Sequence, residues 1–305
     1  MLDYQIKMEF PEFKAIELQD RDFIQNVLSK YQPQTSEWTF TNLFIWQNHY
    51  QFQWTTYNNN LIILCSNNGL YFFQPIGLES RLEVTRMLLR WLKKEKGEME
   101  PRIERADQRL IAEIKGADDF IIEPTPDQFD YVYRAVDLIK LAGRKYHQKK
   151  NHLNSFIKNN QFTYEPLSER YIKECLELTD TWCQLHRCED DMNLLSEWEA
   201  IRETLANFSA LKIQGGVILI DKKVEAFALG ELLNNSSAVV HIEKANPEIR
   251  GSYAIINQQF CEKTWQNTEY INREQDLGEP GLRQAKESYN PVHLVDKFRI
   301  KRAKK

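Results

Sequence analysis

Residues 215–245 read GGVILIDKKVEAFALGELLNNSSAVVHIEKA, three apolar runs separated by two short polar turns. The runs cover 217–220, 224–233 and 238–245, and the turn sequences DKK and NNSS lie between them. Runs of this length and composition, bounded by turn-forming residues, are typical of β-strands joined by tight connections. We therefore expect three consecutive strands at the centre of the second half of the chain.

The sequence on either side of these strands alternates between helical and extended patterns. Helical spacing of apolar residues and turn-forming residues between elements locate the other predicted elements. They are a strand at 161–166, helices at 169–186 and 192–208, a helix at 252–265, a strand at 270–273, a helix from 278 to about 289 and a strand at 292–301. The predicted order is therefore β-α-α-β-β-β-α-β-α-β.

The first half of the chain repeats this order. Its predicted elements are strands at 13–16, 51–57, 61–65, 70–75, 102–105, 120–122 and 129–135, and helices at 21–31, 41–48, 79–96 and 107–115. An element order that occurs twice predicts a tandem duplication of one topology. We expect an α+β protein with an N-terminal domain over 1–140, a basic connecting helix over 141–160 and a C-terminal domain over 161–305 that holds the site.

The composition is that of a globular protein with about two domains. The chain has 305 residues, of which 42% are hydrophobic and 28% charged. Its longest apolar runs fall far short of the ~20 residues that span a bilayer, and the start MLDYQIKMEF lacks the apolar region of a signal peptide. Five cysteines at irregular spacing favour reduced thiols in the cytoplasm. No metal site is predicted, because Cys183, His186 and Cys188 have no fourth ligand nearby.

Basic residues are concentrated in two segments, although the formal net charge is −4. Residues 138–164 and 297–305 contain Lys and Arg but no Asp or Glu. On a helix, Lys145, Lys149 and His152 would share one face. A stripe of this kind favours a tRNA backbone as partner, and the alternative is a solvated helix between the domains. The candidate residues for binding tRNA or phosphate are Arg144, Lys145, His147, Lys149 and Lys150.

The predicted element order resembles the Gcn5-related acetyltransferase (GNAT) fold, whose mixed sheet splays between its middle strands to admit an acyl donor. The resemblance implies two tandem GNAT-like domains. Users of acetyl-coenzyme A carry [QR]-x-x-G-x-[GA] where the helix after the third inner strand begins, whereas this chain reads PEIRGSYA at 247–254. Glu248 and Tyr253 depart from that pattern, so coenzyme A is less expected than another donor and no cofactor is expected to be required.

Several stretches resemble one bacterial family. They are NREQDLGEPGLRQAKESYNP at 272–291, HIEKA at 241–245, RGSY at 250–253, NQQF at 257–260 and GRKYHQKKNH at 143–152. They are similar to the C-terminal domain of phosphatidylglycerol lysyltransferase, and the last is also similar to the Fem-type aminoacyltransferases. The resemblance implies transfer of an aminoacyl group from aminoacyl-tRNA to an amine or hydroxyl acceptor, on a small molecule or a lipid headgroup. The alternatives are an N-acetyltransferase that uses an acyl-coenzyme A and a non-catalytic protein that binds tRNA or an amino acid.

The resemblance also implies a set of site residues in the second half. Glu243 is a candidate to bind the substrate's ammonium group, and its alternative is an ion pair with Lys244 or Arg250. Asp276 has a catalytic and a helix-capping interpretation, and Tyr289 is either a proton donor to the departing ribose oxygen or a core aromatic residue. The catalytic candidates are Glu243, Glu274, Asp276 and Tyr289. The substrate-binding candidates are His241, Arg250, Gly251, Tyr253, Asn272, Arg273 and Lys286.

Overall fold

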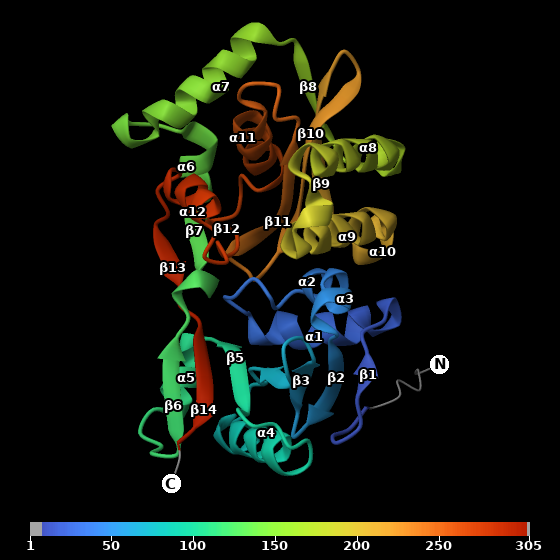
Figure 1. Ribbon diagram of the computed structural model, residues 1–305. Helices are drawn as coiled ribbons and strands as arrows, with labels where there is room; N and C mark the ends of the chain where they lie inside the picture. The colour runs from blue at the N-terminus through green and yellow to red at the C-terminus, as the bar shows by residue number, and fades with distance from the viewer. Residues whose placement is uncertain (1–7, 304–305) are drawn as a thin grey trace. The chain divides into compact units, whose positions relative to one another are not determined.

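The computed structural model describes residues 8–303, which divide into two compact units (Figure 1). Unit 1 comprises the described residues up to Phe129 and those from Val295 onward, and unit 2 comprises Asp130–Leu294. Each unit is built on one mixed sheet, in which seven strands lie within the described part of the chain. The α+β class and the tandem GNAT-like architecture that the sequence predicts are therefore confirmed.

Unit 1 has the sheet order β1-β2-β3-β4-β5-β14-β6, with β4 and β5 as its parallel pair. Helix α4 packs its apolar side on this sheet through Leu88, Leu89 and Leu92, which are fully buried. The elements are β1 (Lys14–Ala15), η1 (Leu18–Asp20), α1 (Arg21–Tyr31), α2 (Phe40–Ile45), α3 (Gln47–Tyr50), β2 (Gln53–Tyr57), β3 (Asn60–Cys65), β4 (Tyr71–Phe73), α4 (Leu82–Lys94), β5 (Arg102–Ala106), α5 (Gln108–Ile114), β6 (Phe120–Pro124), η2 (Pro126–Gln128) and β14 (Phe298–Arg302).

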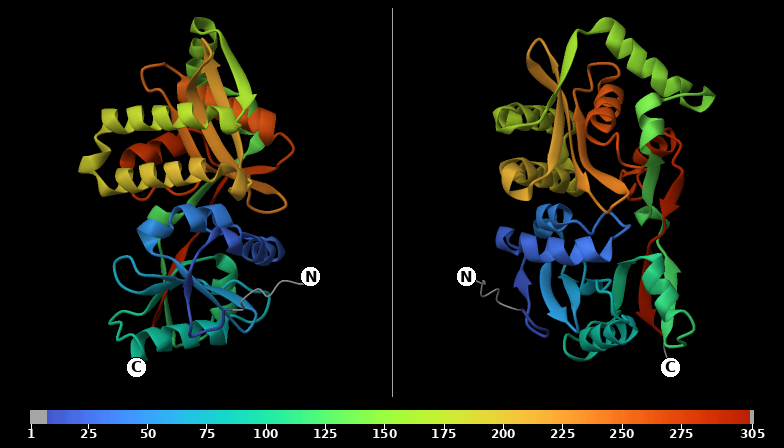
Figure 2. Two further views of the ribbon diagram at one scale, coloured as in Figure 1. Left: turned by 90° about the vertical axis from the view of Figure 1, so that its right-hand side faces the viewer. Right: turned by 180° about the vertical axis from the view of Figure 1, so that it is seen from behind.

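Unit 2 has the sheet order β13-β7-β12-β11-β10-β9-β8. Helices α8 and α9 cover one face of the sheet and α11 lies on the other (Figure 2). The elements are β7 (Asp130–Arg134), α6 (Ala135–Lys140), η3 (Arg144–Tyr146), α7 (His147–Asn159), β8 (Phe162–Pro166), α8 (Glu169–His186), η4 (Cys188–Asp190), α9 (Met192–Ala206), α10 (Phe208–Leu211), β9 (Gln214–Ile220), β10 (Lys223–Leu232), β11 (Ser237–Ala245), α11 (Ser252–Thr264), β12 (Tyr270–Asn272), α12 (Pro280–Glu287) and β13 (His293–Val295).

The division of the chain differs from the predicted boundaries at 140 and 160. In unit 1 the last strand of the chain, β14, lies between β5 and β6, and in unit 2 β7 takes the corresponding place between β12 and β13. The basic segment 141–160 therefore lies inside unit 2 instead of connecting two domains. The physical reason is pairing between strands that are far apart in sequence, such as Tyr133 opposite Ile271, which local periodicity does not encode.

The sheet of unit 2 opens between β11 and β12. These parallel strands pair over only three residues of β11, Ser237–Val239, and β11 then continues to Ala245 without β12 beside it. The register between β10 and β11 also shifts at Leu229 and Gly230, which leaves His241 in a β-bulge. The second half of β11 therefore borders an opening of the sheet on the side away from β10.

Helix α11 begins at a glycine that the packing requires. Gly251 has a φ of +88°, and a Cβ added there would lie 2.4 Å from the carbonyl oxygen of His152 in α7. Gly281, in the first turn of α12, would have no atom within 4 Å of an added Cβ. The close contact between α7 and the start of α11 therefore excludes every side chain at residue 251.

We predict that Gly251→Ala lowers the free energy of unfolding by about 2 kcal/mol, because it combines a strained φ with a backbone clash. Gly281→Ala is the matched control, and we expect unchanged or slightly higher stability because alanine favours helix over glycine. Urea unfolding followed by circular dichroism measures both. Equal stabilities of the two variants would contradict the packing of α7 on α11.

Candidate functional site

The opening beside β11 gathers side chains from four elements of unit 2 and from the loop after β12. β11 provides His241 and Glu243, the loop after β12 provides Arg273 and Glu274, and α11 provides Asn257. Lys286 on α12, Tyr289 just after it and Lys149 on α7 complete the group. Seven of the sixteen residues that the sequence nominates therefore lie together, although they span positions 149 to 289.

Glu243 is held by two donors within the opening. Its Oε1 accepts a hydrogen bond from Nη2 of Arg273 at 3.1 Å, and its Oε2 accepts one from Nδ2 of Asn257 at 3.0 Å. The carboxylate is 11% exposed, so it is enclosed but reachable from solvent. The sequence had offered an ion pair with Lys244 or Arg250 as the alternative, and the structure places the pair with Arg273 instead.

Lys244 and Arg250 lie outside this group. Lys244 is buried, and its Nζ lies 2.9 Å from a carboxylate oxygen of Glu197 and 3.4 Å from the ring centroid of Trp182. Neighbouring side chains of a strand point to opposite faces, which explains why Lys244 and Glu243 have different partners. Arg250 is exposed in the loop before α11.

Two cations pack against the ring of Tyr289. The guanidinium carbon of Arg273 lies 4.8 Å from the ring centroid, and Nζ of Lys149 lies 4.3 Å from it. Burial lowers the pKa of Lys149, and the charge of Arg273 lowers it further, while Glu243 acts in the opposite direction. Burial raises the pKa of Tyr289, so its hydroxyl keeps its proton at neutral pH.

Lys286 is an amine with a strongly lowered pKa. Its Nζ donates a hydrogen bond to the backbone oxygen of Arg273, and its own backbone oxygen accepts one from Tyr133 at 2.8 Å. Burial and then the charge of Arg273 lower its pKa to about 8, although Glu274, Asp130 and Glu243 favour the charged form. A useful fraction of Lys286 is therefore neutral under mildly alkaline conditions.

His241 is clamped between two carboxylates. Its Nδ1 lies 2.7 Å from Oε1 of Glu274 and its Nε2 lies 3.1 Å from Oε1 of Glu231. Burial disfavours the imidazolium, but the hydrogen bonds to Glu231 and Glu274 outweigh it and raise the pKa to about 9. His241 is therefore charged at neutral pH. Glu274 adopts a left-handed φ of +59°, a conformation that is often found at functional sites.

Asp276 fixes the loop after β12. Its carboxylate is 1% exposed and accepts hydrogen bonds from the Tyr131 hydroxyl at 2.7 Å, the Gly278 amide at 2.9 Å and the Arg283 Nε at 2.6 Å. Burial alone would raise its pKa, but the bonds from Arg283, Gly278 and Tyr131 lower it to about 2. The N-cap residue of α12 is Glu279, so the helix-capping interpretation of Asp276 is wrong.

Asn272, Gly251 and Tyr253 also support the surrounding backbone. Asn272 is buried, donates to Oδ2 of Asp130 at 3.0 Å and accepts from the Glu274 amide at 2.8 Å. Gly251 permits the contact of α11 with α7. Tyr253 is partly buried in the first turn of α11, where burial raises its pKa to about 12.

The basic residues before α8 separate into an outer and an inner set. Arg144, Lys145, His147 and Lys150 are exposed, whereas Lys149 is partly buried against Tyr289. Arg144 and Lys145 belong to η3, and α7 begins only at His147, so the single continuous stripe that the sequence predicts is broken by the turn. Only Lys149 of this set reaches the opening.

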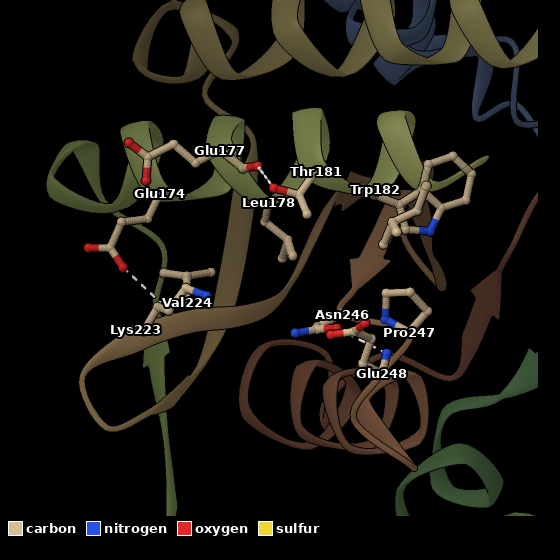
Figure 3. A pocket seen from close by; sticks show the side chains of 11 residues that line it. Glu174, Glu177, Leu178, Thr181, Trp182, Lys223, Val224, Asn246, Pro247 and Glu248 are labelled. Atoms are coloured by element: carbon tan, nitrogen blue, oxygen red, sulfur yellow. Dashed lines mark hydrogen bonds between the residues drawn. The ribbon is translucent and has the colours of Figure 1, made fainter. Parts of the chain in front are cut away.

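A second hollow lies on the face of the sheet that α8 covers (Figure 3). It has a volume of about 340 Å³ between α8, the start of β10 and the loop that joins β11 to α11. Three carboxylates, Glu174, Glu177 and Glu248, line it against the single lysine Lys223. Local sequence pattern does not reveal this hollow, because its residues come from three separate segments.

One pair of cysteines differs from the expectation of reduced thiols. The structure joins Cys183 at the end of α8 to Cys188 in η4, while Cys65, Cys175 and Cys261 are free and buried. Arg187 adopts a left-handed φ of 52° and turns the chain back, which brings the two Cα atoms to 5.2 Å. Residue spacing in the sequence did not reveal this reversal.

The helices over the described residues include none with the length and apolar character needed to span a membrane. Comparison with protein families matches residues 28–301 to the model described as phosphatidylglycerol lysyltransferase, C-terminal. Among curated proteins, an uncharacterized protein of Mycoplasmoides gallisepticum, MYCGA3080, is 26% identical over 185 residues, 56% of each chain. The match therefore spans about half the length of that relative.

Solved structures give a closer match. A conserved protein of unknown function from Bacteroides thetaiotaomicron is 32% identical, with a TM-score of 0.89 over 95% of this chain and 99% of its own. The C-terminal domain of a putative lysylphosphatidylglycerol synthetase from Agrobacterium fabrum has a TM-score of 0.66, 12% identity and coverage of 94% and 92%. FemX has a TM-score of 0.57, 11% identity and coverage of 94% and 96%. The last two share the fold.

We predict that Asp276→Asn lowers the free energy of unfolding by about 2 kcal/mol, because it removes the charge that Arg283 and the Gly278 amide stabilise. The folded-state pKa of about 2 lies below the ordinary value of about 3.9, so this contribution is complete above pH 4 and is lost as the pH falls toward 2. Asp221→Asn, in an exposed turn, is the control. Urea titrations at pH 7 and pH 3 measure the free energy of unfolding of each protein. We expect Asp276→Asn to be less stable than the wild type at pH 7 and the difference to be smaller at pH 3, whereas Asp221→Asn should match the wild type at both.

Proposed function

Because the chain belongs to the family of the C-terminal domain of phosphatidylglycerol lysyltransferase, we propose that it is an acyltransferase that takes an aminoacyl group from aminoacyl-tRNA. The acceptor is an amine or a hydroxyl, on a small molecule or a lipid headgroup. The observation that supports this most is the parting of β11 from β12 after Val239, which exposes the Glu243 carboxylate within an enclosed polar group.

Glu243 binds the α-ammonium group of the aminoacyl donor in this proposal. A carboxylate accepts about four hydrogen bonds, and Arg273 and Asn257 each use one of these positions. The remaining lone pairs are available to an ammonium group, and the two donors keep the carboxylate charged and oriented. The partly exposed position of Glu243 gives a small cation access to it.

The transfer step needs a base, a stabiliser for the oxyanion and a proton for the leaving group. The acceptor nitrogen or oxygen attacks the ester carbonyl carbon, and the bond from that carbon to the ribose oxygen breaks when the tetrahedral intermediate collapses. We assign removal of the acceptor's proton to Lys286, whose pKa is about 8. Arg273 stabilises the oxyanion, and the Tyr289 hydroxyl gives a proton to the ribose oxygen and regains one from Lys286.

The donor brings its own activated ester, so we propose that no bound cofactor takes part. Coenzyme A is the less favoured donor because Glu248 stands where its users carry Gln or Arg, and Glu248 also lines the acidic hollow. A pyrophosphate beside Glu174, Glu177 and Glu248 would meet repulsion. The exposed residues Arg144, Lys145 and Lys150 provide positive charge for the tRNA backbone.

We predict that Glu243→Gln lowers kcat/KM for aminoacyl transfer about 100-fold, because the amide cannot hold the ammonium group electrostatically. The assay follows a labelled amino acid from charged tRNA to phosphatidylglycerol or to a panel of amines. Glu287→Gln, an exposed change on α12, is the control with wild-type rate. Transfer from acetyl-coenzyme A but not from charged tRNA would overturn the proposal, as would full activity of Glu243→Gln.

The pH dependence tests the assignment of Lys286. A lysine whose pKa is lowered to about 8 is protonated below that pH, so kcat/KM should rise as the pH increases from 6.5 to 8.5. Lys286→Arg keeps the charge but cannot lose its proton, and we expect a rate about 100-fold lower with no such rise. Rates are corrected for spontaneous hydrolysis of the ester at each pH. An unchanged rising limb in Lys286→Arg would assign the base to another group.

A further inference from the structure

Lys149, Arg273 and Tyr289 form a group with two cations, of which only Arg273 forms an ion pair with a carboxylate, that of Glu243, among residues 8–303. We propose that it is a phosphate-binding subsite that takes one phosphodiester of an RNA ligand, an inference that deepens the proposed function and rests on it for the identity of the RNA. The chemistry recognised is a tetrahedral oxyanion held between an ammonium and a guanidinium group.

The two cations lie against one aromatic ring. Nζ of Lys149 and the guanidinium carbon of Arg273 are 4.3 Å and 4.8 Å from the centroid of Tyr289. Over residues 8–303, no carboxylate forms an ion pair with Lys149, and the one acid paired with Arg273 is Glu243, which also accepts from Asn257. The charge of Arg273 lowers the pKa of Lys149, so these two partly buried cations repel each other, and an anion bound to both would remove that cost.

Arg273 also has an unused donor. Its Nη2 binds Glu243, whereas its Nη1 is buried and has no hydrogen-bond partner among the described residues. A buried N–H group without a partner costs free energy, and such groups in native proteins commonly mark a place for a ligand, water or ion. The planar fork of an arginine matches phosphate oxygens, so a phosphate accepting from Nη1 would satisfy this donor.

The location of Lys149 favours RNA as the source of the phosphate. Within residues 144–150, Lys149 is the one basic residue that is partly buried, whereas the others, among them Lys145 and Lys150, are exposed. A ligand that reaches the subsite therefore meets further positive charge directly outside it. That arrangement suits a chain of phosphodiesters better than the single phosphate of a lipid headgroup.

Lys286 is not required for this subsite. Its amine is bonded to the backbone of Arg273, and Glu274, Asp130 and Glu243 all act on its charge, so acids already surround it. The subsite and the proposed proton acceptor are thus separate groups, and substitutions distinguish them.

The first test uses inorganic phosphate as the probe, followed by phosphorus NMR with the whole chain. We expect Lys149→Met to weaken phosphate binding about tenfold, because it removes one of two cations. Lys149→Arg should retain affinity within about threefold, and Lys158→Met, which removes an exposed charge from the same helix, should stay within about twofold. Equal affinities of Lys149→Met and Lys158→Met, or no phosphate binding by the wild type, would overturn the subsite.

The second test identifies the source of the phosphate. Labelled unacylated tRNA and vesicles of phosphatidylglycerol and phosphatidylcholine are titrated separately, with inorganic phosphate as competitor. We expect phosphate to displace tRNA from the wild type, and about tenfold more phosphate to be needed for Lys149→Met. Vesicle binding that depends on Lys149, without tRNA binding, would overturn the RNA assignment. Neither test needs a donor or acceptor, so a failed transfer assay leaves both results interpretable.

Discussion

The short pairing of β11 with β12 is the constraint on which the rest of unit 2 depends. Three residues of β11 hydrogen-bond to β12, and the next six extend past it. A strand that lacks a neighbour on one side leaves groups on that side that must find other partners. Glu243 finds Arg273 and Asn257, and His241 finds Glu274 and Glu231. Ion pairs therefore cross the opening where a ladder of backbone hydrogen bonds would otherwise close it.

The loop after β12 must be rigid for this arrangement to hold. Asn272 and Asp276 use their side chains to fix it, through Asp130 on one side and through Tyr131, Gly278 and Arg283 on the other. Both residues are buried, and neither reaches into the group around Glu243. Their bonds hold Arg273 and the left-handed Glu274 in place, which is the kind of support that a reactive group needs from its surroundings.

The sequence predicted the parts of the fold that depend on local pattern. The apolar runs of 215–245 and the helices that flank them appear as expected, and so does their repetition in the first half. It did not predict that β7 and β14 join sheets built mainly from the other half of the chain, because strand pairing at long range leaves no local periodicity. For the same reason, the family resemblance nominated site residues, but the sequence did not show that Lys149 turns inward or that Asp276 braces a loop.

Unit 1 contains a parted sheet of the same kind, which it uses differently. β4 and β5 pair only at Phe72 and Phe73, and Arg105 in β5 has a left-handed φ of +57°, as Glu274 has after β12. There Glu37 accepts hydrogen bonds from both Arg105 and Lys297, and the three side chains are 6%, 7% and 0% exposed. Although burial opposes it, the two cations lower the pKa of Glu37 and keep it charged.

The two openings differ in how many of their charged groups form ion pairs and in how far those groups are exposed to solvent. In unit 1 a carboxylate is enclosed by two cations that it pairs with directly, and all three groups are sealed from solvent, so that the cluster fills the gap as a core would. In unit 2 the Glu243 carboxylate pairs with one cation, Arg273, and these two side chains are 11% and 14% exposed. A second cation, Lys149, lies against the Tyr289 ring with Arg273 and forms no ion pair with a carboxylate among residues 8–303. A charge left unpaired beside solvent costs stability without adding to the core, which is the expected cost of keeping a place for a charged ligand. The duplicated topology therefore supplies two parted sheets, and the balance of charge is what favours the second as the one that binds.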